Sequence, residues 1–289
     1  MKKVTLLLVL TVCAISLKSQ NRDSSAFAGG DWKSQIITSG VVYKYCHFTD
    51  STLFNSNQFI SVIEIDPKTG RGVSIQPSPV LKETSSIASE NGAIAAVNGS
   101  FFRFNYTVDT ISYNSVDYIR KNGRQYAPNT FKVPWKREQH QLGALAVLSN
   151  RLYILKADNI SEWEKYIYAG EVITTGPLLM KEGKKEKMLD ASFYTTRHPR
   201  TAVAITYGGR ILLITVDGRS QESAGVSLKE LTKISEWLGA KDAINLDGGG
   251  STTMYIKGMP NNGVVNHPCD NKKFDNFGER KVANAILVL

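Results

Sequence analysis

Residues 243–252 read Ala-Ile-Asn-Leu-Asp-Gly-Gly-Gly-Ser-Thr, a short apolar run followed by an acid, three glycines and two hydroxyl side chains. The apolar run predicts a buried strand that ends at Asp247. Loops that follow such strands commonly carry functional residues. Successive glycines let backbone N–H groups approach a ligand and form an anion-binding nest. A tight turn between two strands is the alternative interpretation.

The residues before this stretch predict two strands and a helix that lead into it. Residues 201–206 and 211–216 are apolar runs separated by a glycine-containing turn, and the second run ends at Asp217. Ser227 and Glu230 have the spacing of a capping box that starts a helix. Its apolar face consists of Leu228, Leu231, Ile234, Trp237 and Leu238, and Gly239 is suited to end it.

A similar order is predicted earlier in the chain. Residues 59–66 and 72–76 are typical of strands, a short helical stretch ends at Asn91, and the apolar run 93–97 leads into Asn98. The recurrence indicates a degenerate duplication of a ββαβ unit, and chance similarity between two such segments is the alternative. We therefore predict a mixed α/β or α+β fold, one large domain of two related ββαβ halves around a shared cleft.

Residues 103–140 join the two predicted halves and are rich in aromatic side chains, including Tyr106, Tyr113, Tyr118, Tyr126 and Trp135. A segment of this length is too long for a passive connection in a compact domain. It is either a lid or sugar-stacking loop, or an insertion with its own small core. Beyond it, residues 142–155 predict a hairpin around Ser149-Asn150, and residues 283–289 a closing strand.

The N-terminus has the features of a secretory signal peptide: two lysines, an apolar run from Val4 to Ile15, and small residues before a cut after Ser19. The run is too short to span a bilayer as a helix. We expect a secreted or periplasmic protein without an integral membrane span. Lipid anchoring at Cys13 is less favoured because Val12 stands where a small residue is normally needed.

The rest of the chain is expected to be a loose leader over residues 20–40 and one domain over residues 41–289. After removal of residues 1–19, the cysteines that remain are Cys46 and Cys269. They could pair in an oxidising compartment, or they are two buried thiols.

The charge of the chain favours an anionic substrate but not nucleic acid. The full chain carries +9. Loss of Lys2, Lys3 and Lys18 leaves 32 basic against 26 acidic side chains, a net charge of +6. The basic residues are spread along the chain and form no stripe of the kind that follows a phosphate backbone. A modest positive field attracts anionic small molecules or glycans.

Common hydrolase motifs are absent, and arginines mark the remaining candidate site. The sequence contains no GxxxxGK[ST], GxSxG or HExxH, and its four histidines are scattered. Arg200, Arg219 and Arg280 lie near the ends of predicted strands. A guanidinium binds two oxygens of a phosphate at once, so the three together indicate an anionic ligand.

Six short motifs occur in the C-terminal two thirds of the sequence. They are Asn98-Gly-Ser-Phe-Phe, Thr175-Gly-Pro-Leu-Leu, His198-Pro-Arg-Thr, Val216-Asp-Gly-Arg, Asn245-Leu-Asp-Gly-Gly-Gly-Ser-Thr and Glu279-Arg-Lys-Val-Ala-Asn. These motifs resemble those of the phosphodiester glycosidase family, over roughly residues 90–289, with Ser100 where glycine is commoner in the family. The resemblance implies hydrolysis of a sugar-1-phosphodiester, which releases the sugar and leaves a phosphomonoester.

Chemical roles follow from this reaction. Asp247 or Asp217 is expected to be the nucleophile or base at the anomeric carbon, with Glu279 as a reserve acid. Arginine clamps on the departing phosphate replace much of the work of an acid. Asn98 is expected to contact a sugar hydroxyl. The expected substrate-binding set is Asn98, Arg200, Thr201, Arg219, Gly248, Gly249, Gly250, Ser251, Thr252 and Arg280.

Two other functions fit the same residues. The first is a non-catalytic protein that binds surface polysaccharide. The second is a metal-dependent phosphodiesterase that cleaves the P–O bond, with Asp217, Asp247 and Asp270 holding Mg²⁺ or Ca²⁺ through oxygen ligands. No cofactor is assigned from the sequence.

Overall fold

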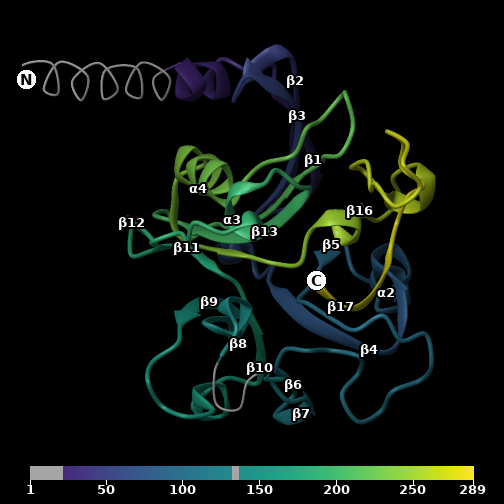
Figure 1. Cartoon of the computed structure of the whole chain (residues 1–289). Helices are drawn as coiled ribbons and strands as arrows, with labels where there is room; N and C mark the ends of the chain where they lie inside the picture. Colours follow the sequence, from purple (N-terminus) through teal and green to yellow (C-terminus); the bar gives the residue numbers. More distant parts are fainter. Residues whose placement is uncertain (1–21, 132–136) are drawn as a thin grey trace, which may run out of the picture.

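The computed structural model describes residues 22–131 and 137–289 (Figure 1). The described residues form three antiparallel sheets and a few short helices, which confirms the prediction of a mixed helix and sheet fold. The signal peptide expected over residues 1–19, with Cys13, lies outside the described residues, as does Trp135. Among the described residues, no helix is long and apolar enough to cross a membrane.

The largest sheet has the order β1-β2-β3-β14-β13-β15-β11-β12. Its central hairpin, β13 and β14, pairs Arg200 with Val216, so the residues that follow β14 lie beside the start of β13. The strands are β1 (Lys33–Thr38), β2 (Val41–Leu53), β3 (Ser56–Ile65), β11 (Leu178–Lys181), β12 (Lys184–Lys185), β13 (Arg200–Thr206), β14 (Ile211–Val216) and β15 (Ala240–Asn245).

A four-stranded sheet and a five-stranded sheet complete the domain. Their strand orders are β16-β5-β17-β4 and β7-β6-β10-β8-β9. The first contains β4 (Val73–Glu83), β5 (Ala95–Asn98), β16 (Met254–Ile256) and β17 (Lys281–Val288). The second contains β6 (Ile119–Lys121), β7 (Arg124–Ala127), β8 (Gly143–Leu148), β9 (Arg151–Lys156) and β10 (Glu171–Thr175).

The helices are short. The longest in the described part of the chain is α4 (Leu228–Trp237), which packs against β15 and β11. The predicted capping box is confirmed: the Ser227 hydroxyl accepts from the Glu230 N–H, and the Glu230 carboxylate accepts from the Ser227 N–H at 2.8 Å. The others are α2 (Thr84–Glu90), α3 (Ser192–Thr195) and the 3₁₀ turns η1 (Pro67–Thr69), η2 (Gln139–Gln141), η3 (Trp163–Tyr166), η4 (Gly249–Ser251) and η5 (Asn261–Gly263).

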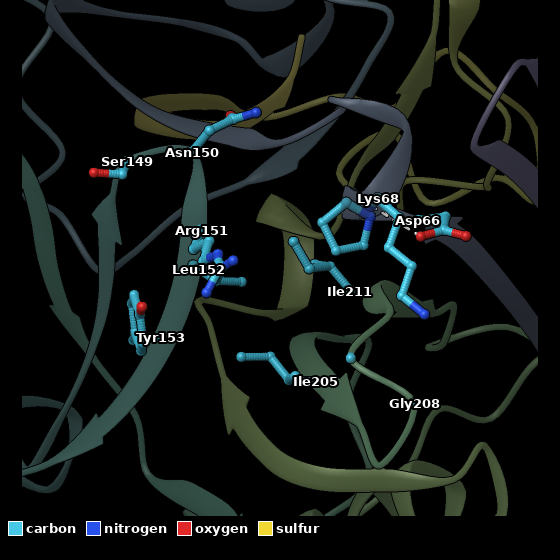
Figure 2. A pocket seen from close by; sticks show the side chains of 12 residues that line it. Asp66, Lys68, Ser149, Asn150, Arg151, Leu152, Tyr153, Ile205, Gly208 and Ile211 are labelled. Atoms are coloured by element: carbon cyan, nitrogen blue, oxygen red, sulfur yellow. Dashed lines mark hydrogen bonds between the residues drawn. The ribbon is translucent and has the colours of Figure 1, made fainter.

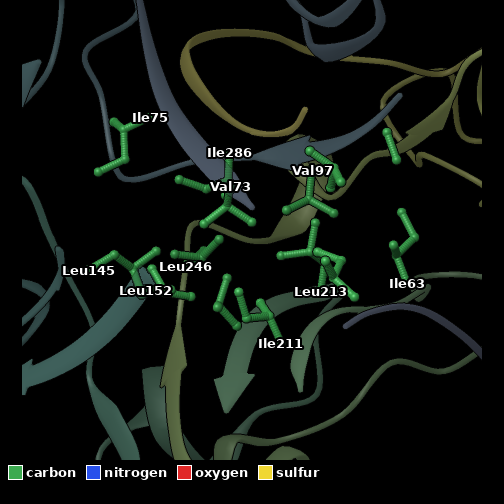
Figure 3. Packing of buried hydrophobic residues seen from close by; sticks show 14 of the residues in the cluster. Ile63, Val73, Ile75, Val97, Leu145, Leu152, Ile211, Leu213, Leu246 and Ile286 are labelled. Carbon is green, nitrogen blue, oxygen red and sulfur yellow. The ribbon is translucent and has the colours of Figure 1, made fainter. Parts of the chain in front are cut away.

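One apolar core is shared by the three sheets (Figure 3). Ile63 comes from the largest sheet, Leu145 from the five-stranded sheet and Ile286 from the four-stranded sheet, and all three are almost fully buried. Burial of a side chain of this size contributes about 1.5–3 kcal/mol to folding. The core holds the three sheets together, and the loops at one end of their strands carry the candidate site.

The expectation of a loose leader over residues 20–40 is wrong for its described part. Residues 22–28 are helical and β1 follows. Phe27 is buried, and its ring centroid lies 5.2 Å from those of Trp32 and Trp237. A polar segment with few apolar residues gives little periodic signal, and this aromatic contact with the helix α4 region holds it in place.

The two predicted ββαβ halves have the expected order of elements but different pairings. In the second half, β13 and β14 form a hairpin. In the first half, β3 pairs with β2 and β14, whereas β4 pairs with β17 in another sheet. The repeated order is therefore local and does not produce two equivalent halves.

The described part of the joining segment, residues 103–131 and 137–140, contains both a buried portion and an exposed loop, and a lid or sugar-stacking role stays a prediction. β6 and β7 extend the five-stranded sheet, and Tyr118 is buried there. Residues 103–114, by contrast, form a loop that exposes Tyr106. The hairpin predicted around Ser149-Asn150 is confirmed, and both turn residues have positive φ.

Candidate active site

The ends of β5, β13 and β15 meet at one place in the fold. Asn98, at the end of β5, is fully buried and its Nδ2 donates to the backbone carbonyl of Asp247 at 2.8 Å. Its Oδ1 accepts from the Thr201 hydroxyl at 2.7 Å and from the Thr253 N–H at 3.3 Å. Asn98 and Asp247 are therefore in direct contact. Asn98 and Thr201 thus form a buried hydrogen-bonded contact that supports the Asp247 backbone, and we call it the brace. This role differs from the sugar contact expected of Asn98.

The three glycines after Asp247 lie against three arginines. A β-carbon on Gly248 would lie 2.7 Å from the Pro199 carbonyl and 3.7 Å from Cδ of Arg200. On Gly249 it would lie 3.0 Å from Nη2 of Arg219. The arginines come from the start of β13 and from the residues after β14, far apart in sequence.

Gly250 lies against the third arginine, Arg280. A β-carbon there would collide with Asp270 Oδ1 and Arg280 Nη2. Arg280 and Asp270 form a bidentate pair, with Nε–Oδ2 and Nη2–Oδ1 distances of 2.8 and 2.6 Å. This carboxylate orients the guanidinium and raises the pKa of Arg280, so the group stays charged.

The expected amide nest is not formed by Gly248 and Gly249. The N–H of Gly248 donates to Asp247 Oδ1 at 2.9 Å, and that of Gly249 donates to the Pro199 carbonyl at 2.8 Å. The side chains of Ser251 and Thr252 are buried. Glycine is used here for close packing, and the positive charge at the site comes from the arginines.

Asp247 is a half-buried carboxyl among these groups. Burial raises its pKa to about 6, and the carboxyl of Asp117 adds to the rise. The Ser251 hydroxyl, the Gly248 N–H and Arg280 oppose it. A carboxyl with this pKa is mostly ionised at neutral pH and exchanges its proton readily there.

Arg200 is buried beside Asp247. Its Nε donates to the Val226 carbonyl at 3.1 Å, and its Nη2 donates to the carbonyl of Phe193 at 2.7 Å. Burial lowers its pKa to about 10, and Arg219 contributes to the drop. The guanidinium is still charged at neutral pH and is held rigidly.

A histidine–aspartate pair that was not predicted from the sequence lies close to Asp247. Asp117 is fully buried, and its Oδ1 lies 2.5 Å from Nδ1 of His140. Its Oδ2 accepts from the Phe101 N–H at 3.2 Å. Burial raises the pKa of Asp117 to about 6, opposed by the His140 contact. Asp117 lies in an irregular stretch and His140 in the short 3₁₀ turn η2, and no motif in the sequence indicates that the two meet.

Asp217 is placed differently from the role expected of it. It is 1% exposed, and its oxygens accept from Asn266 Nδ2 at 2.7 Å and from the His267 N–H at 2.8 Å. Its Oδ2 also lies 2.8 Å from Nδ1 of His267, whose ring stacks on Phe274 at 3.8 Å. Asp217 therefore positions the 264–267 segment, since a buried and saturated carboxylate is poorly placed to attack a substrate.

Glu279 is bound at the start of α2. Its carboxylate accepts from the Ser85 N–H at 3.0 Å and from the Ser85 hydroxyl at 2.5 Å. Burial raises its pKa. The structure gives this side chain a capping contact with the helix rather than the position of a free acid beside Asp247.

The expected acidic metal ligands do not face one another. Asp270 is paired with Arg280, and Asp217 with His267. Within residues 22–131 and 137–289, no three His, Cys, Asp or Glu side chains are grouped so as to hold a metal ion. The two cysteines are also apart and free. Cys46 is buried, and Sγ of Cys269 lies 3.8 Å from Nη1 of Arg219.

A cavity of about 430 Å³ lies at the opposite end of these strands (Figure 2). Ile205 and Ile211, at the turn between β13 and β14, line it together with Lys68 and Arg151. The strands β13 and β14 separate it from Arg200 and Asp217. It is distinct from the arginine-rich site.

Known proteins share parts of this sequence and its fold. A family model described as phosphodiester glycosidase matches residues 91–289. Over 91 residues, the chain is 32% identical to the prophage-derived protein YomE of Bacillus subtilis strain 168. That alignment spans 31% of this chain and only 14% of YomE.

Two solved structures are similar in fold. The catalytic domain of zebrafish N-acetylglucosamine-1-phosphodiester alpha-N-acetylglucosaminidase, auto-inhibited by its pro-peptide, matches with a TM-score of 0.60 and 18% identity. The match covers 89% of this chain and 83% of that chain. A hypothetical protein from Synechocystis matches with a TM-score of 0.57 and 17% identity, over 89% of this chain and 63% of that chain.

The family match includes every residue placed around Asp247 above, from Asn98 to Arg280, and spans more than half of the chain. The chain therefore belongs to the phosphodiester glycosidase family.

Proposed function

We propose that this protein is a hydrolase that cleaves the anomeric C–O bond of a sugar-1-phosphodiester and releases the sugar and a phosphomonoester. The observation that carries the proposal is the packing of Arg200, Arg219 and Arg280 over the glycines that follow Asp247. Three guanidinium groups gathered around Asp247 and its glycines suit a substrate that carries a phosphate next to the bond to be broken. The family match supports the same reaction class.

The arginines act on the leaving group. A phosphodiester carries one negative charge, and cleavage at the anomeric carbon leaves a monoester with a second developing charge. Arg219 and Arg280 are half-buried or exposed and are the cations that a phosphate can reach. Arg200 is buried, and its attraction to the phosphate is stronger in the transition state than with bound substrate because the negative charge on the phosphate increases.

Asp247 acts at the anomeric carbon. At neutral pH its carboxyl is mostly ionised, as a nucleophile or a general base must be. Asp117 lies close enough to raise the pKa of Asp247, and we assign to the Asp117–His140 pair removal of the proton from the attacking water. Asp217 acts as a positioning residue through His267.

The proposal includes an extracellular or periplasmic location, for which the sequence features of residues 1–19 are the support. A phosphodiester of an exported glycan, such as an exopolysaccharide, fits this location. The two alternatives, a polysaccharide binder and a metal-dependent phosphodiesterase, predict different results in the same assay.

The first test is turnover of a panel of sugar-1-phosphodiesters, with released sugar and phosphomonoester measured separately, with and without a chelator. We expect equal release of both products that is insensitive to chelation and at least about a hundredfold lower in Asp247→Asn. Binding of glycans without turnover of any ester would favour the polysaccharide binder. Loss of turnover on chelation would favour the metal-dependent enzyme.

A further inference from the structure

Four large apolar side chains on one loop beside the candidate site are exposed to solvent. They are Phe104, Tyr106, Val108 and Ile111, with exposed fractions of 63, 65, 68 and 87%. We refer to them as the apolar rim. Single exposed apolar residues are common, but a group of this kind on one loop marks a binding surface.

The loop that carries the apolar rim is held by many hydrogen bonds. Asp109 accepts from the N–H groups of Ile111 and Ser112, both at 2.9 Å, and from that of Asn114 at 3.0 Å. The N–H of Asp109 in turn donates to the Pro79 carbonyl of β4 at 2.7 Å. The Ser112 hydroxyl, together with the N–H groups that the carboxylate accepts from, lowers the pKa of Asp109. The exposed side chains are therefore presented by a fixed backbone, which reduces the entropy lost on binding.

The apolar rim begins beside Arg280, one of the arginines to which we assign the phosphate. The guanidinium carbon of Arg280 lies 5.2 Å from the centre of the Phe104 ring, and the Phe102 and Phe104 ring centroids are 5.2 Å apart. Arg280 also contributes to the electrostatic environment of Asp247. The Asp247 carboxyl, the Arg280 guanidinium and the apolar rim therefore follow one another in this order along the site.

We infer that the aglycone of the natural substrate is a hydrocarbon chain esterified to the phosphate, and that the apolar rim binds it. This inference rests on the proposed function, and it names the substrate class. An amphiphile of this kind has the same order of chemistry as the site: sugar, phosphate, then hydrocarbon. Each methylene that leaves water on the rim favours binding, so affinity rises with chain length.

The test compares two ligands that differ only in their aglycone. Phosphonate analogues of N-acetylglucosamine-1-phosphate that lack the scissile C–O bond, as methyl and octyl esters, are titrated calorimetrically into the whole protein. We expect the octyl ester to bind at least about tenfold more tightly. Hydrolysis of the two matching phosphate esters is followed in parallel, with the same preference expected in kcat/KM.

The rim variant is Tyr106→Ser combined with Val108→Ser and Ile111→Ser, which keeps Phe104 on Arg280. We expect its octyl-to-methyl affinity ratio to fall below about two. Tyr168→Ser is the matched control, because Tyr168 is 89% exposed but lies outside the rim. The ratio is taken within one preparation, so a loss of folded protein does not change it.

The outcomes separate the two proposals. An octyl preference in binding that the rim variant loses supports the inference. If that preference is found but neither phosphate ester is hydrolysed, the inference holds and only the proposed reaction fails. Equal affinity for both analogues overturns the inference. Equal affinity together with rim-dependent binding to phosphatidylglycerol vesicles overturns it in favour of a membrane-contact surface. Equal affinity with a rim-dependent dimer overturns it in favour of a second copy of this chain.

Discussion

The side-chain amide of Asn98 donates a hydrogen bond to the backbone carbonyl of Asp247, and the Nδ2–O distance is 2.8 Å. The two residues end different strands in different sheets and are far apart in sequence. The bond fixes the backbone that carries the Asp247 carboxyl, and the Thr201 hydroxyl completes the brace from β13. The position of Asp247 therefore depends on a buried polar contact as well as on its own strand.

Replacing Asn98 with alanine is expected to destabilise the protein. The change leaves the Thr201 hydroxyl and the Asp247 carbonyl without this partner in a buried setting, which costs about 1–3 kcal/mol per unsatisfied group. The measurement is urea unfolding of Asn98→Ala, with Gln125→Ala as an exposed amide control expected within about 0.5 kcal/mol of the parent. An unchanged unfolding midpoint for Asn98→Ala would show that the hydrogen bonds of Asn98 do not contribute to the stability of the protein.

The pH dependence of kcat/KM is expected to report Asp247. Burial raises its pKa to about 6. Its ionised form is the reactive one, so activity falls by at least about tenfold per pH unit as the pH drops below about 6, where the pKa of Asp117 also lies. The measurement is a pH profile between pH 4 and 8, and activity that is flat down to pH 4.5 would contradict the assignment.

The Asp247→Asn variant is expected to lose activity without losing stability. The raised pKa means that ionisation is less favourable in the folded protein than in the unfolded chain. The protonated Asp247 carboxyl therefore favours the folded state at low pH. This contribution to the free energy of unfolding is lost as the pH rises through about 6. At pH 8 we expect Asp247→Asn to lose activity at least about a hundredfold while remaining at least as stable as the parent in thermal unfolding. A large fall in melting temperature would instead indicate a structural role.

Gly250→Ala is expected to weaken substrate binding by displacing Arg280. An added methyl group would collide with the Asp270–Arg280 pair. We expect KM to rise by at least about tenfold, because a misplaced guanidinium loses its bidentate contact with phosphate. Gly170→Ala is the control, since a β-carbon there meets no atom within 4 Å. Equal KM values for the two variants would remove Arg280 from the phosphate site.

His140→Ala and Asp117→Asn are expected to lower kcat by similar amounts, about a hundredfold, because each removes proton transfer by the pair. The measurement is steady-state kinetics of both single variants and of the double variant. If the pair acts as a unit, the double variant is little worse than either single one. Effects that multiply in the double variant would show that the residues act independently.

Elements with local signals were predictable from the sequence. The capping box at Ser227, the turn at Ser149-Asn150 and the strands around Asp217 and Asp247 follow from spacing and alternation, and the structure has them. The arginines were found because each lies next to a predicted strand. The family resemblance rested on the same strand-end motifs, and the family model confirms it.

Features that depend on distant contacts were not predictable. The amide of Gly249 is taken by Pro199, and the carboxylate of Glu279 by Ser85, in both cases by partners that no local pattern indicates. The His140–Asp117 pair joins the 3₁₀ turn η2 to an irregular stretch before β6. The residues 22–28 form a helix because Phe27 packs in an aromatic cluster, a tertiary effect that overrides weak local preference.

The most direct test of the central claim is hydrolysis of an N-acetylglucosamine-1-phosphodiester in ¹⁸O-labelled water, with the products analysed by mass spectrometry. Cleavage at the anomeric carbon, with Asp247 acting there and the arginines holding the departing phosphate, predicts the label in the sugar hydroxyl. Label in the phosphomonoester would mean attack at phosphorus and would contradict the account.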